Sequence, residues 1–373
     1  MASAYLDHAA TTPMRPEAVA AMLPFLVERF GNPSGGHAVA RLARQAVDEA
    51  REELAGLLGA EPGQVVFTGS GTEADNLAIG GVAATREGTV VCTAAEHHAV
   101  LHAVQAAGGQ VVPVTGEGVV DLDALAAALG PDTLVVSVML ANNETGVISP
   151  LAQVVDLVRE RAPGALVHTD AVQAFPWIDV ATLTREADLV TVSAHKFGGP
   201  KGVGALVARG RAVVRPIIHG GGQERDRRSG THNVAGIVAM CAAARATVAS
   251  RGDTVAAVGA LRDRLADGLL AAVPGAVETG ARAGKIAGNC HLRFPGAESE
   301  ALLVRLDQAG ICASAGSSCA SGAIEASHVL VAMGLDAEEA STGLRLSLGH
   351  TTSSEEVDHA LATIPKAVEA LRG

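Results

Sequence analysis

Aromatic residues are scarce in this chain of 373 residues, which holds one Trp, one Tyr and six Phe. Its core must therefore be built from Ala, Val, Leu and Ile, and it lacks the aromatic platforms that stack on single-stranded nucleic acid. Acidic residues outnumber basic ones by 40 to 28, and the net charge of −12 gives no long-range attraction to nucleic acids or anionic membranes. We therefore expect no direct nucleic-acid binding.

The sequence also lacks the usual patterns of secreted, membrane-spanning and metal-binding proteins. It has five cysteines, an odd number, and no two of them form a C-x-x-C pair. This usage is typical of reduced thiols in the cytoplasm. No H-E-x-x-H motif or His/Cys cluster at ligand spacing indicates a metal site. The N-terminus carries Asp7 without a basic region, and no uninterrupted apolar run approaches the roughly 18 residues of a membrane span. The sequence predicts a soluble cytoplasmic protein with no membrane partner.

Hydrophobic residues make up 48% of the chain, and they occur in short runs that alternate with helical patterns. This alternation predicts an α/β fold with a mostly parallel central sheet and helices on both faces. After about residue 246, Ala-rich helical segments alternate with short strands, which indicates a smaller α+β domain. We predict a large domain at 15–245 and a small domain at 246–373, joined by an N-terminal segment at 1–14. The predicted strands are 64–67, 89–93, 133–140, 166–168, 189–193 and 204–208 in the large domain and 289–294 and 342–348 in the small one, with small-domain helices at 254–273 and 299–309.

Polar side chains follow several of the predicted strands directly. They are Thr72, His97, Asn143, Asp170 and Lys196. Ligands of open α/β sheets bind beyond the carboxyl ends of the strands, so one pocket is expected to collect all five residues. His97 and His98 are adjacent in sequence, and we expect at most one of them to face that pocket.

The segment Gly69–Glu73 joins a strand to a helix. Its free N–H groups and hydroxyls suit a phosphate at a helix N-terminus. It matches neither a P-loop nor the G-x-G-x-x-G pattern, and on its own this segment is better explained as a helix start capped by Ser70 or Thr72.

Two charged residues lie at strand ends where a ligand would bind. Lys196, in Ser-Ala-His-Lys-Phe-Gly-Gly, can act as a nucleophilic amine if it is partly desolvated, or it is an exposed turn lysine. Asp170 has few charged neighbours, and a buried carboxylate there needs a cation such as a protonated pyridine nitrogen. The alternative for Asp170 is a helix N-cap.

Cys319 lies among small residues in Ala-Ser-Ala-Gly-Ser-Ser-Cys-Ala-Ser-Gly, and an exposed thiol there is a candidate nucleophile. Cys312, in an apolar run, is predicted to belong to the core. Arg345 alternates with leucines on a predicted strand, where it either grips a substrate carboxylate or faces outward. The glycine-rich segment 220–233 carries three arginines, and we interpret it as a solvated loop or a subunit contact.

Taken together, these motifs resemble those of the cysteine desulfurases, which are class V members of the pyridoxal-phosphate aminotransferase superfamily with the type I fold. The resemblance runs from end to end, and the number and order of the motifs make it specific. The matching segments are Tyr5–Thr12, Phe30–Ser34, Gly71–Asn76, Glu96–His97, Asn142–Gly146, His168–Gln173, Ser193–Lys196, the segment from Gly220, the segment around Cys319, and Arg345.

The resemblance implies roles around the cofactor pyridoxal 5′-phosphate. Lys196 would hold the cofactor as a Schiff base, Asp170 would pair with its pyridine nitrogen, and His97 would stack on its ring. Gln173 and Asn143 would lie beside the ring hydroxyl and the cofactor edge.

The family also implies a phosphate site and a second subunit. Gly71, Thr72, Ser193 and His195 would hold the phosphate. A threonine at the position of Thr231 reaches that phosphate from the neighbouring subunit in the family, so the resemblance implies a homodimer.

The implied reaction converts L-cysteine to L-alanine and leaves sulfur on Cys319 as a persulfide. Arg345 with Asn143 would bind the substrate carboxylate, and His97 would donate or accept a proton near the sulfur. The segment around Cys319 has the long form of enzymes that pass sulfur to iron–sulfur scaffolds or tRNA-thiolation partners.

The sequence departs from the family at three places. It has Ile324-Glu325-Ala326-Ser327 where Leu-Glu-Pro-Ser is frequent, Ala320 in place of a common threonine, and His98 where lysine or proline is often found. None of them removes a catalytic group. A class V aminotransferase, a selenocysteine lyase and a non-catalytic sulfur-relay scaffold remain the alternatives.

Overall fold

A seven-stranded sheet forms the centre of the larger part of the molecule in a computed structural model that describes residues 4–316 and 326–373. The strand order is β2-β8-β7-β6-β5-β3-β4. The strands from β7 to β4 run parallel, whereas β8 runs antiparallel to both β7 and β2. The bounds are β2 (Val65–Thr68), β3 (Thr89–Thr93), β4 (Gln110–Val112), β5 (Thr133–Ser137), β6 (Leu166–Asp170), β7 (Leu189–Ser193) and β8 (Gly204–Ala208).

Both faces of this sheet are buried, because successive side chains enter different cores. Val65 and Phe67 of β2 join the core on one face, and Val66 joins the core on the other. The first core also takes residues from α2, α6 and α8, and the second takes residues from α3 and α4. The mostly parallel α/β sheet predicted from the sequence is thus confirmed. The helices of this part are α1 (Pro16–Val27), α2 (Ala38–Leu57), α3 (Gly71–Ala83), α4 (His98–Ala106), α5 (Leu122–Ala128), α6 (Leu151–Arg161) and α7 (Val180–Leu183), and α8 (Val234–Ala272) follows.

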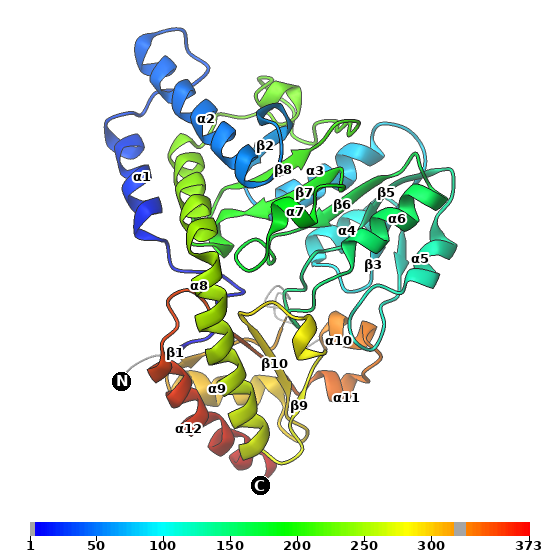
Figure 1. The fold of residues 1–373 in the computed structure, drawn as a ribbon, viewed down its shortest axis with the longest axis vertical. Helices are drawn as coiled ribbons and strands as arrows, with labels where there is room; N and C mark the ends of the chain where they lie inside the picture. Colours follow the sequence, from blue (N-terminus) through cyan, green and yellow to red (C-terminus); the bar gives the residue numbers. More distant parts are fainter. Residues whose placement is uncertain (1–3, 317–325) are drawn as a thin grey trace.

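A smaller antiparallel sheet of order β12-β10-β9 lies at the other end of the molecule (Figure 1). Its core is made with helices α9 and α12 and with the second half of α8. Its elements are β9 (Val277–Glu278), β10 (Asn289–Arg293), α9 (Ser299–Gln308), β12 (Gly343–Ser347) and α12 (Ser354–Arg372), with α10 (His328–Ala332) and α11 (Ala337–Ala340) between α9 and β12.

Helix α8 extends from the large part of the molecule into the small part and packs in both cores (Figure 1). The sequence predicts a helix only from Thr254, but the helix starts at Val234. It changes the face that it buries between the two cores, so no single apolar stripe marks it. It is long and apolar enough to span a membrane, but 61% of its most apolar window is buried inside the protein, as in a core helix. The predicted division at residue 246 falls within this continuous helix and stays a prediction.

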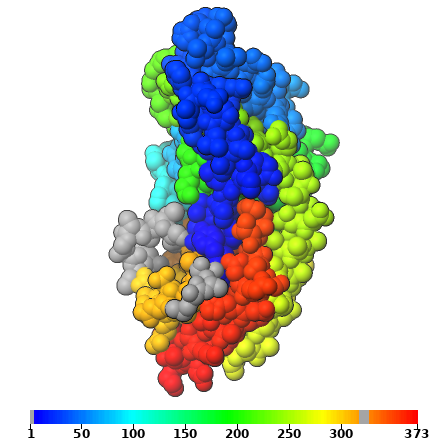
Figure 2. Space-filling view, turned by 90° about the vertical axis from the view of Figure 1, so that its left-hand side faces the viewer, coloured from blue at the N-terminus to red at the C-terminus, as the bar shows by residue number. Residues whose placement is uncertain are grey.

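The N-terminal segment joins the two parts. Strand β1 (Ala4–Tyr5) pairs in parallel with β11 (Ile311–Cys312), and Asp7 forms a bridge with Ser347 at the end of β12. Figure 2 shows these first described residues running from α1 down to the C-terminal elements. This segment therefore crosses the seam between the large part and the small part of the molecule.

Candidate active site

A cavity of about 270 Å³ lies at this seam, beyond the carboxyl ends of the parallel strands. It is lined by residues of the large sheet, of the N-terminal segment and of the small sheet. Of the twelve site residues predicted from the sequence, ten line the cavity: Gly71, Thr72, His97, Asn143, Asp170, Gln173, Ser193, His195, Lys196 and Arg345. The expected convergence on one pocket is thus observed.

Helix α3 points its N-terminus into the cavity. Ser70 caps the helix by accepting a hydrogen bond from the Glu73 N–H at 3.0 Å, so the helix-cap interpretation of this segment holds. A Cβ at Gly71 would lie 3.1 Å from Val172 Cγ2 and 3.2 Å from Ser193 Cβ, so there is little room for a side chain. The Ser193 hydroxyl is buried and has no hydrogen-bond partner within the described chain. The arrangement leaves free N–H groups and a hydroxyl that suit an anion.

Asp170 ends strand β6 and is 5% exposed. One carboxylate oxygen accepts from the Val172 N–H at 2.8 Å, so Asp170 also forms the capping contact considered from the sequence. Burial raises the pKa of Asp170 to about 6, while that hydrogen bond and the charge of Lys196 act in the opposite direction. A cation placed against this carboxylate would stabilise its ionised form.

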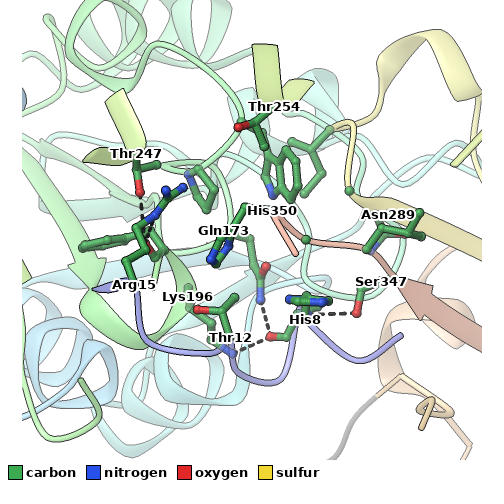
Figure 3. A pocket seen from close by; sticks show the side chains of 18 residues that line it. His8, Thr12, Arg15, Gln173, Lys196, Thr247, Thr254, Asn289, Ser347 and His350 are labelled. Carbon is green, nitrogen blue, oxygen red and sulfur yellow. Dashed lines mark hydrogen bonds between the residues drawn. The ribbon is translucent and has the colours of Figure 1, made fainter. Parts of the chain in front are cut away.

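Lys196 follows β7 and reaches back to the N-terminal segment. Its Nζ donates to the main-chain oxygens of Ala9 at 2.5 Å and of Ala10 at 2.9 Å. Gln173 Nε2 donates to the same Ala9 oxygen at 2.8 Å. A second, much smaller cavity of about 30 Å³, shown in Figure 3, shares Ala9, Gln173 and Lys196 with the first. Lys196 therefore stands in the common wall and is not the exposed turn lysine of the alternative interpretation.

His97 and His98 both line the cavity, so the expectation that at most one of them faces it is wrong. The physical reason is that His97 is the extended N-cap of α4 and His98 its first helical residue, so the chain bends between them. His97 Nδ1 accepts from the Ala99 N–H at 3.1 Å, which assigns its proton to Nε2. Burial and then the charge of Lys196 lower the pKa of His97 to about 4. The ring is neutral near pH 7 and can donate from Nε2.

Arg345 lies in the middle of β12 and points inward, with 2% exposure. One terminal nitrogen donates to the Gly316 oxygen at 2.8 Å and to the Asn143 oxygen at 3.1 Å. The other donates to Asp7 Oδ1 at 2.9 Å. These contacts exclude the outward-facing alternative and place a guanidinium group beside the Asn143 side chain, whose buried Oδ1 has no partner in the described chain.

Several buried acids at the site were not predicted as functional residues. Asp75 lines the cavity at 1% exposure and lies 3.6 Å from His168 Nε2. Glu96 is fully buried, and burial raises its pKa to about 8. Glu144 Oε2 accepts from the Ser327 hydroxyl at 2.5 Å, across 183 residues of sequence. Only contacts between distant segments identify these groups, although Asp75, Glu96 and Glu144 all lie within the motifs quoted above.

The remaining predicted residues stand outside the cavity lining. Thr231 is exposed and does not line the cavity of its own chain. Cys319 lies outside the described residues. Cys312 was predicted to belong to the core but is exposed, because Ile311 beside it is buried and successive side chains of a strand face opposite sides. Cys92, Cys241 and Cys290 are buried, and burial raises the pKa of each thiol.

Comparisons with known proteins agree over the whole chain. The aminotransferase class-V family matches residues 4–360. An IscS-like cysteine desulfurase of Mycobacterium tuberculosis is 45% identical over 99% of this chain and 97% of its own. The solved structure of a NifS-like protein superposes with a TM-score of 0.92 at 35% identity, covering 99% of this chain and 100% of its own. The structure of SspA in complex with cysteine superposes with a TM-score of 0.82 at 28% identity, covering 94% and 100%.

Proposed function

The chain belongs to the aminotransferase class-V family and, within it, to the cysteine desulfurases, and from this premise we propose how its own residues act on L-cysteine. The enzyme depends on pyridoxal phosphate and converts L-cysteine to L-alanine. The observation that carries the assignment of roles is the convergence of Asp170, Lys196 and Arg345 on one cavity, from two sheets far apart in sequence.

The residues present fit pyridoxal phosphate at both ends of the cavity. The phosphate end is the start of α3, where Gly71, Thr72, Ser193 and His195 supply main-chain N–H groups and side-chain donors. The unpartnered buried hydroxyl of Ser193 and the close packing around Gly71 support this assignment. A helix N-terminus favours an anion through both its free N–H groups and its dipole.

The ring end is defined by charge. Asp170, desolvated and with a raised pKa, would pair with the pyridine nitrogen, because a cation there repays part of the cost of burying the carboxylate. Gln173 and Asn143 would face the ring hydroxyl and edge, and His97 would cover the ring. When bound, pyridoxal phosphate supplies an electron sink conjugated with the substrate Cα.

Lys196, Arg345 and His97 would handle the substrate. The Lys196 amine would hold the cofactor and would act as the base that takes the proton from the substrate Cα. Arg345, with Asn143, binds the substrate carboxylate through a fork of N–H donors. His97, neutral and protonated on Nε2, donates or accepts a proton near the substrate sulfur.

Cys319 would accept the sulfur. Its thiolate attacks the substrate sulfur, the carbon–sulfur bond of L-cysteine breaks, and a sulfur–sulfur bond to Cys319 forms. The hydrogen lost from the Cys319 thiol balances the one that completes the methyl group of L-alanine. The persulfide then passes to an acceptor protein, either an iron–sulfur scaffold or a thiolation enzyme.

The enzyme would act as a cytoplasmic homodimer. Thr231, exposed on its own chain, would complete the phosphate site of the partner subunit. A reduced cytoplasm suits the four described cysteines, all of which are free, and suits a persulfide that must stay accessible.

The test is turnover of L-cysteine with a reductant, following L-alanine and sulfide together. We expect equal amounts of both products from the wild type and neither from Cys319→Ala. Cys312→Ala, which removes the exposed thiol, is the matched control and should retain full activity. Full activity of Cys319→Ala would overturn the persulfide step and favour a lyase. Alanine formation that needs a keto acid would favour an aminotransferase, and a colourless inactive protein a sulfur-relay scaffold.

A further inference from the structure

Residues 224–226 form a strained turn outside the cavity. Glu224, Arg225 and Asp226 adopt φ angles of 51°, 57° and 62°, and they are the only described residues other than glycine with positive φ. Each L-residue in this left-handed region carries a steric cost, and such conformations persist only where the surrounding structure holds them. The turn lies in the glycine-rich segment 220–233, which also carries Thr231.

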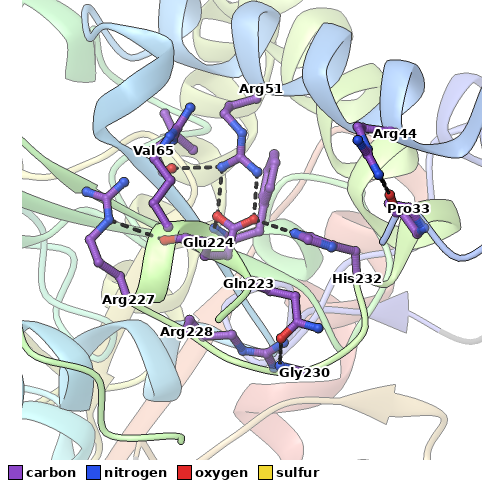
Figure 4. Close-up of polar contacts among 12 residues, drawn as sticks. Pro33, Arg44, Arg51, Val65, Gln223, Glu224, Arg227, Arg228, Gly230 and His232 are labelled. Atoms are coloured by element: carbon purple, nitrogen blue, oxygen red, sulfur yellow. Dashed lines mark hydrogen bonds and ion pairs between the residues drawn. The ribbon is translucent and has the colours of Figure 1, made fainter. Parts of the chain in front are cut away.

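The Glu224 carboxylate holds this turn from inside the protein (Figure 4). Glu224 is 5% exposed. Its carboxylate accepts hydrogen bonds from both terminal nitrogens of Arg51 at 2.6 and 2.7 Å. It is also hydrogen-bonded to the Phe67 N–H at 2.8 Å and to His232 Nε2 at 2.7 Å. Burial alone would raise the pKa of Glu224, but the hydrogen bonds from Arg51 and His232 outweigh it and lower the pKa to about 2. The carboxylate is therefore ionised and fully partnered.

Glu224 and its partner Arg51 also cover the free edge of the central sheet. Strand β2 is an edge strand, so one side of its backbone has no strand neighbour. Glu224 accepts from the N–H of Phe67, and Arg51 donates to the oxygen of Val65 at 2.8 Å. The two side chains thereby satisfy backbone groups that a neighbouring strand would otherwise bind. They hold β2 in place just before the phosphate segment that starts at Gly69.

A second ion pair links the same segment to the phosphate segment directly. Arg228 donates to both carboxylate oxygens of Glu73, at 2.7 and 3.2 Å. Glu73 lies in the first turn of α3, and one of those oxygens also accepts from the Gly69 N–H at 2.8 Å. Segment 220–233 is thus tied to β2 through Glu224 and to the start of α3 through Arg228.

Thr231 stands between two anchored residues. The Gly230 N–H donates to the Gln223 side chain at 2.7 Å, and the ring of His232 is bound to Glu224 (Figure 4). Thr231 itself is exposed, and its side chain does not enter the cavity of its own chain. The segment is built to hold a small hydroxyl residue outward at a fixed place.

We propose that Glu224 is a positioning residue that presents Thr231 to the cofactor phosphate of the partner subunit, and that Arg228 couples this presentation to the subunit's own phosphate segment. The inference rests on the proposed homodimer and on the role proposed for Thr231. It adds that the phosphate site of one subunit depends on a buried network in the other.

Mixed dimers test this with pyridoxal phosphate as the probe. One subunit carries Lys196→Ala, so only the other subunit gives the absorbance of the lysine-linked cofactor, and the dissociation constant is read at that site. We expect Glu224→Ala in the Lys196→Ala subunit to raise this constant about tenfold, as loss of a charge-assisted contact to the phosphate would. Arg225→Ala, which removes a charge from the same turn but leaves the carboxylate network intact, should change it less than twofold.

His232→Ala serves as the second variant, because Glu224→Ala leaves the Arg51 guanidinium buried and can prevent folding. It breaks only the link beside Thr231 and keeps the Arg51–Glu224 pair. We expect His232→Ala to raise the dissociation constant at the partner site as well, but by less than Glu224→Ala does. Thr231→Ala combined with Glu224→Ala in one subunit should give no more than the larger single effect, because both remove the same contact.

The outcomes separate the inference from its premise. If Thr231→Ala weakens the partner site but Glu224→Ala and His232→Ala do not, or act only within their own subunit, the positioning role is wrong and the proposed dimer stands. Additive effects of Thr231→Ala and Glu224→Ala would also contradict it. If Thr231→Ala has no effect on the partner site, or the protein is a monomer, the premise fails and the inference fails with it.

Discussion

The two halves of the cavity wall are held by different kinds of contact. The half proposed to hold the cofactor is made by the large sheet, where Asp170 is fixed through a main-chain N–H and Lys196 through main-chain oxygens. The half proposed to bind the substrate is made by Arg345, which contacts three segments of chain and is paired with Asp7 at a separation of 338 residues. The first half depends mainly on strand ends, with Lys196 also held by the N-terminal segment, and the second depends on how the two sheets and that segment are placed together.

This difference predicts that the two halves can be damaged separately. Changes in the cofactor half should alter cofactor binding as well as turnover. Changes in the substrate half should alter the KM for L-cysteine and leave the bound cofactor intact.

Lys196→Ala should impair both halves of the site at once, because the proposed roles of this amine include cofactor binding and proton transfer from the substrate. We expect turnover of L-cysteine to fall by about 10³-fold or more, since the variant loses the base at Cα as well as the covalent link. The bound cofactor should also lose the absorbance of its lysine-linked form. Lys201→Ala, which changes an exposed lysine nearby, is the control and should behave as the wild type. If Lys196→Ala retained turnover, the proposed role of Lys196 as the base at Cα would be wrong.

Arg345→Ala should isolate the substrate half. The KM for L-cysteine is expected to rise about 10- to 100-fold, because a charge-assisted contact with the carboxylate is lost. The KM of Arg345→Lys should lie between those of the wild type and Arg345→Ala, since lysine keeps the charge but not the two-pronged geometry. The absorbance of the bound cofactor and its dissociation constant should stay unchanged, and a loss of cofactor in Arg345→Lys would contradict the separation.

Lowering the pH should isolate the cofactor half. The pKa of Asp170 is raised to about 6, so the carboxylate is ionised above that pH and becomes neutral below it. A neutral acid cannot pair with the protonated ring, and the affinity of the apoprotein for pyridoxal phosphate should fall up to about tenfold per pH unit below 6. Titration of the apoprotein with cofactor between pH 5 and 8 measures this. Asp170→Asn should bind weakly with no step near pH 6, and identical profiles for both proteins would assign the dependence elsewhere.

Gly71→Ala should have the smallest effect and act only at the phosphate end. The added methyl group would lie 3.1 to 3.2 Å from Val172 and Ser193, so we expect cofactor affinity to weaken a few-fold, on the order of 1 kcal/mol. Gly56→Ala in α2 is the matched control, because nothing lies within 4 Å of its Cβ position. That variant should keep full affinity and gain about 0.5–1 kcal/mol of stability in thermal unfolding. Equal affinities of the two variants would argue against close contact at Gly71.

The sequence predicts the cofactor half better than the substrate half, for a physical reason. Residues such as Asp170 and Lys196 follow apolar strands, and parallel strands bring their carboxyl ends to one edge whatever the details of packing. The strands themselves are buried on both faces, so their apolar runs are continuous and easy to recognise.

The substrate half and the anchoring networks could not be derived in that way. Whether Arg345 points inward depends on a partner 338 residues away, and pattern alone left both orientations open. The start of α8 at Val234 was also not predicted, because α8 passes from one core to the other and buries different faces in them. The strained turn at Glu224 is also hidden from sequence patterns, since the left-handed residues there are not glycines.

The fate of the sulfur atom tests the central claim most directly. The holoenzyme is incubated with L-cysteine without reductant, and its peptides are examined by mass spectrometry alongside a measurement of L-alanine. We predict the added mass of one sulfur atom on the peptide that contains Cys319, with L-alanine formed in equal amount. Added sulfur on the exposed Cys312 instead, or L-alanine formed with no persulfide on the protein, would contradict the account.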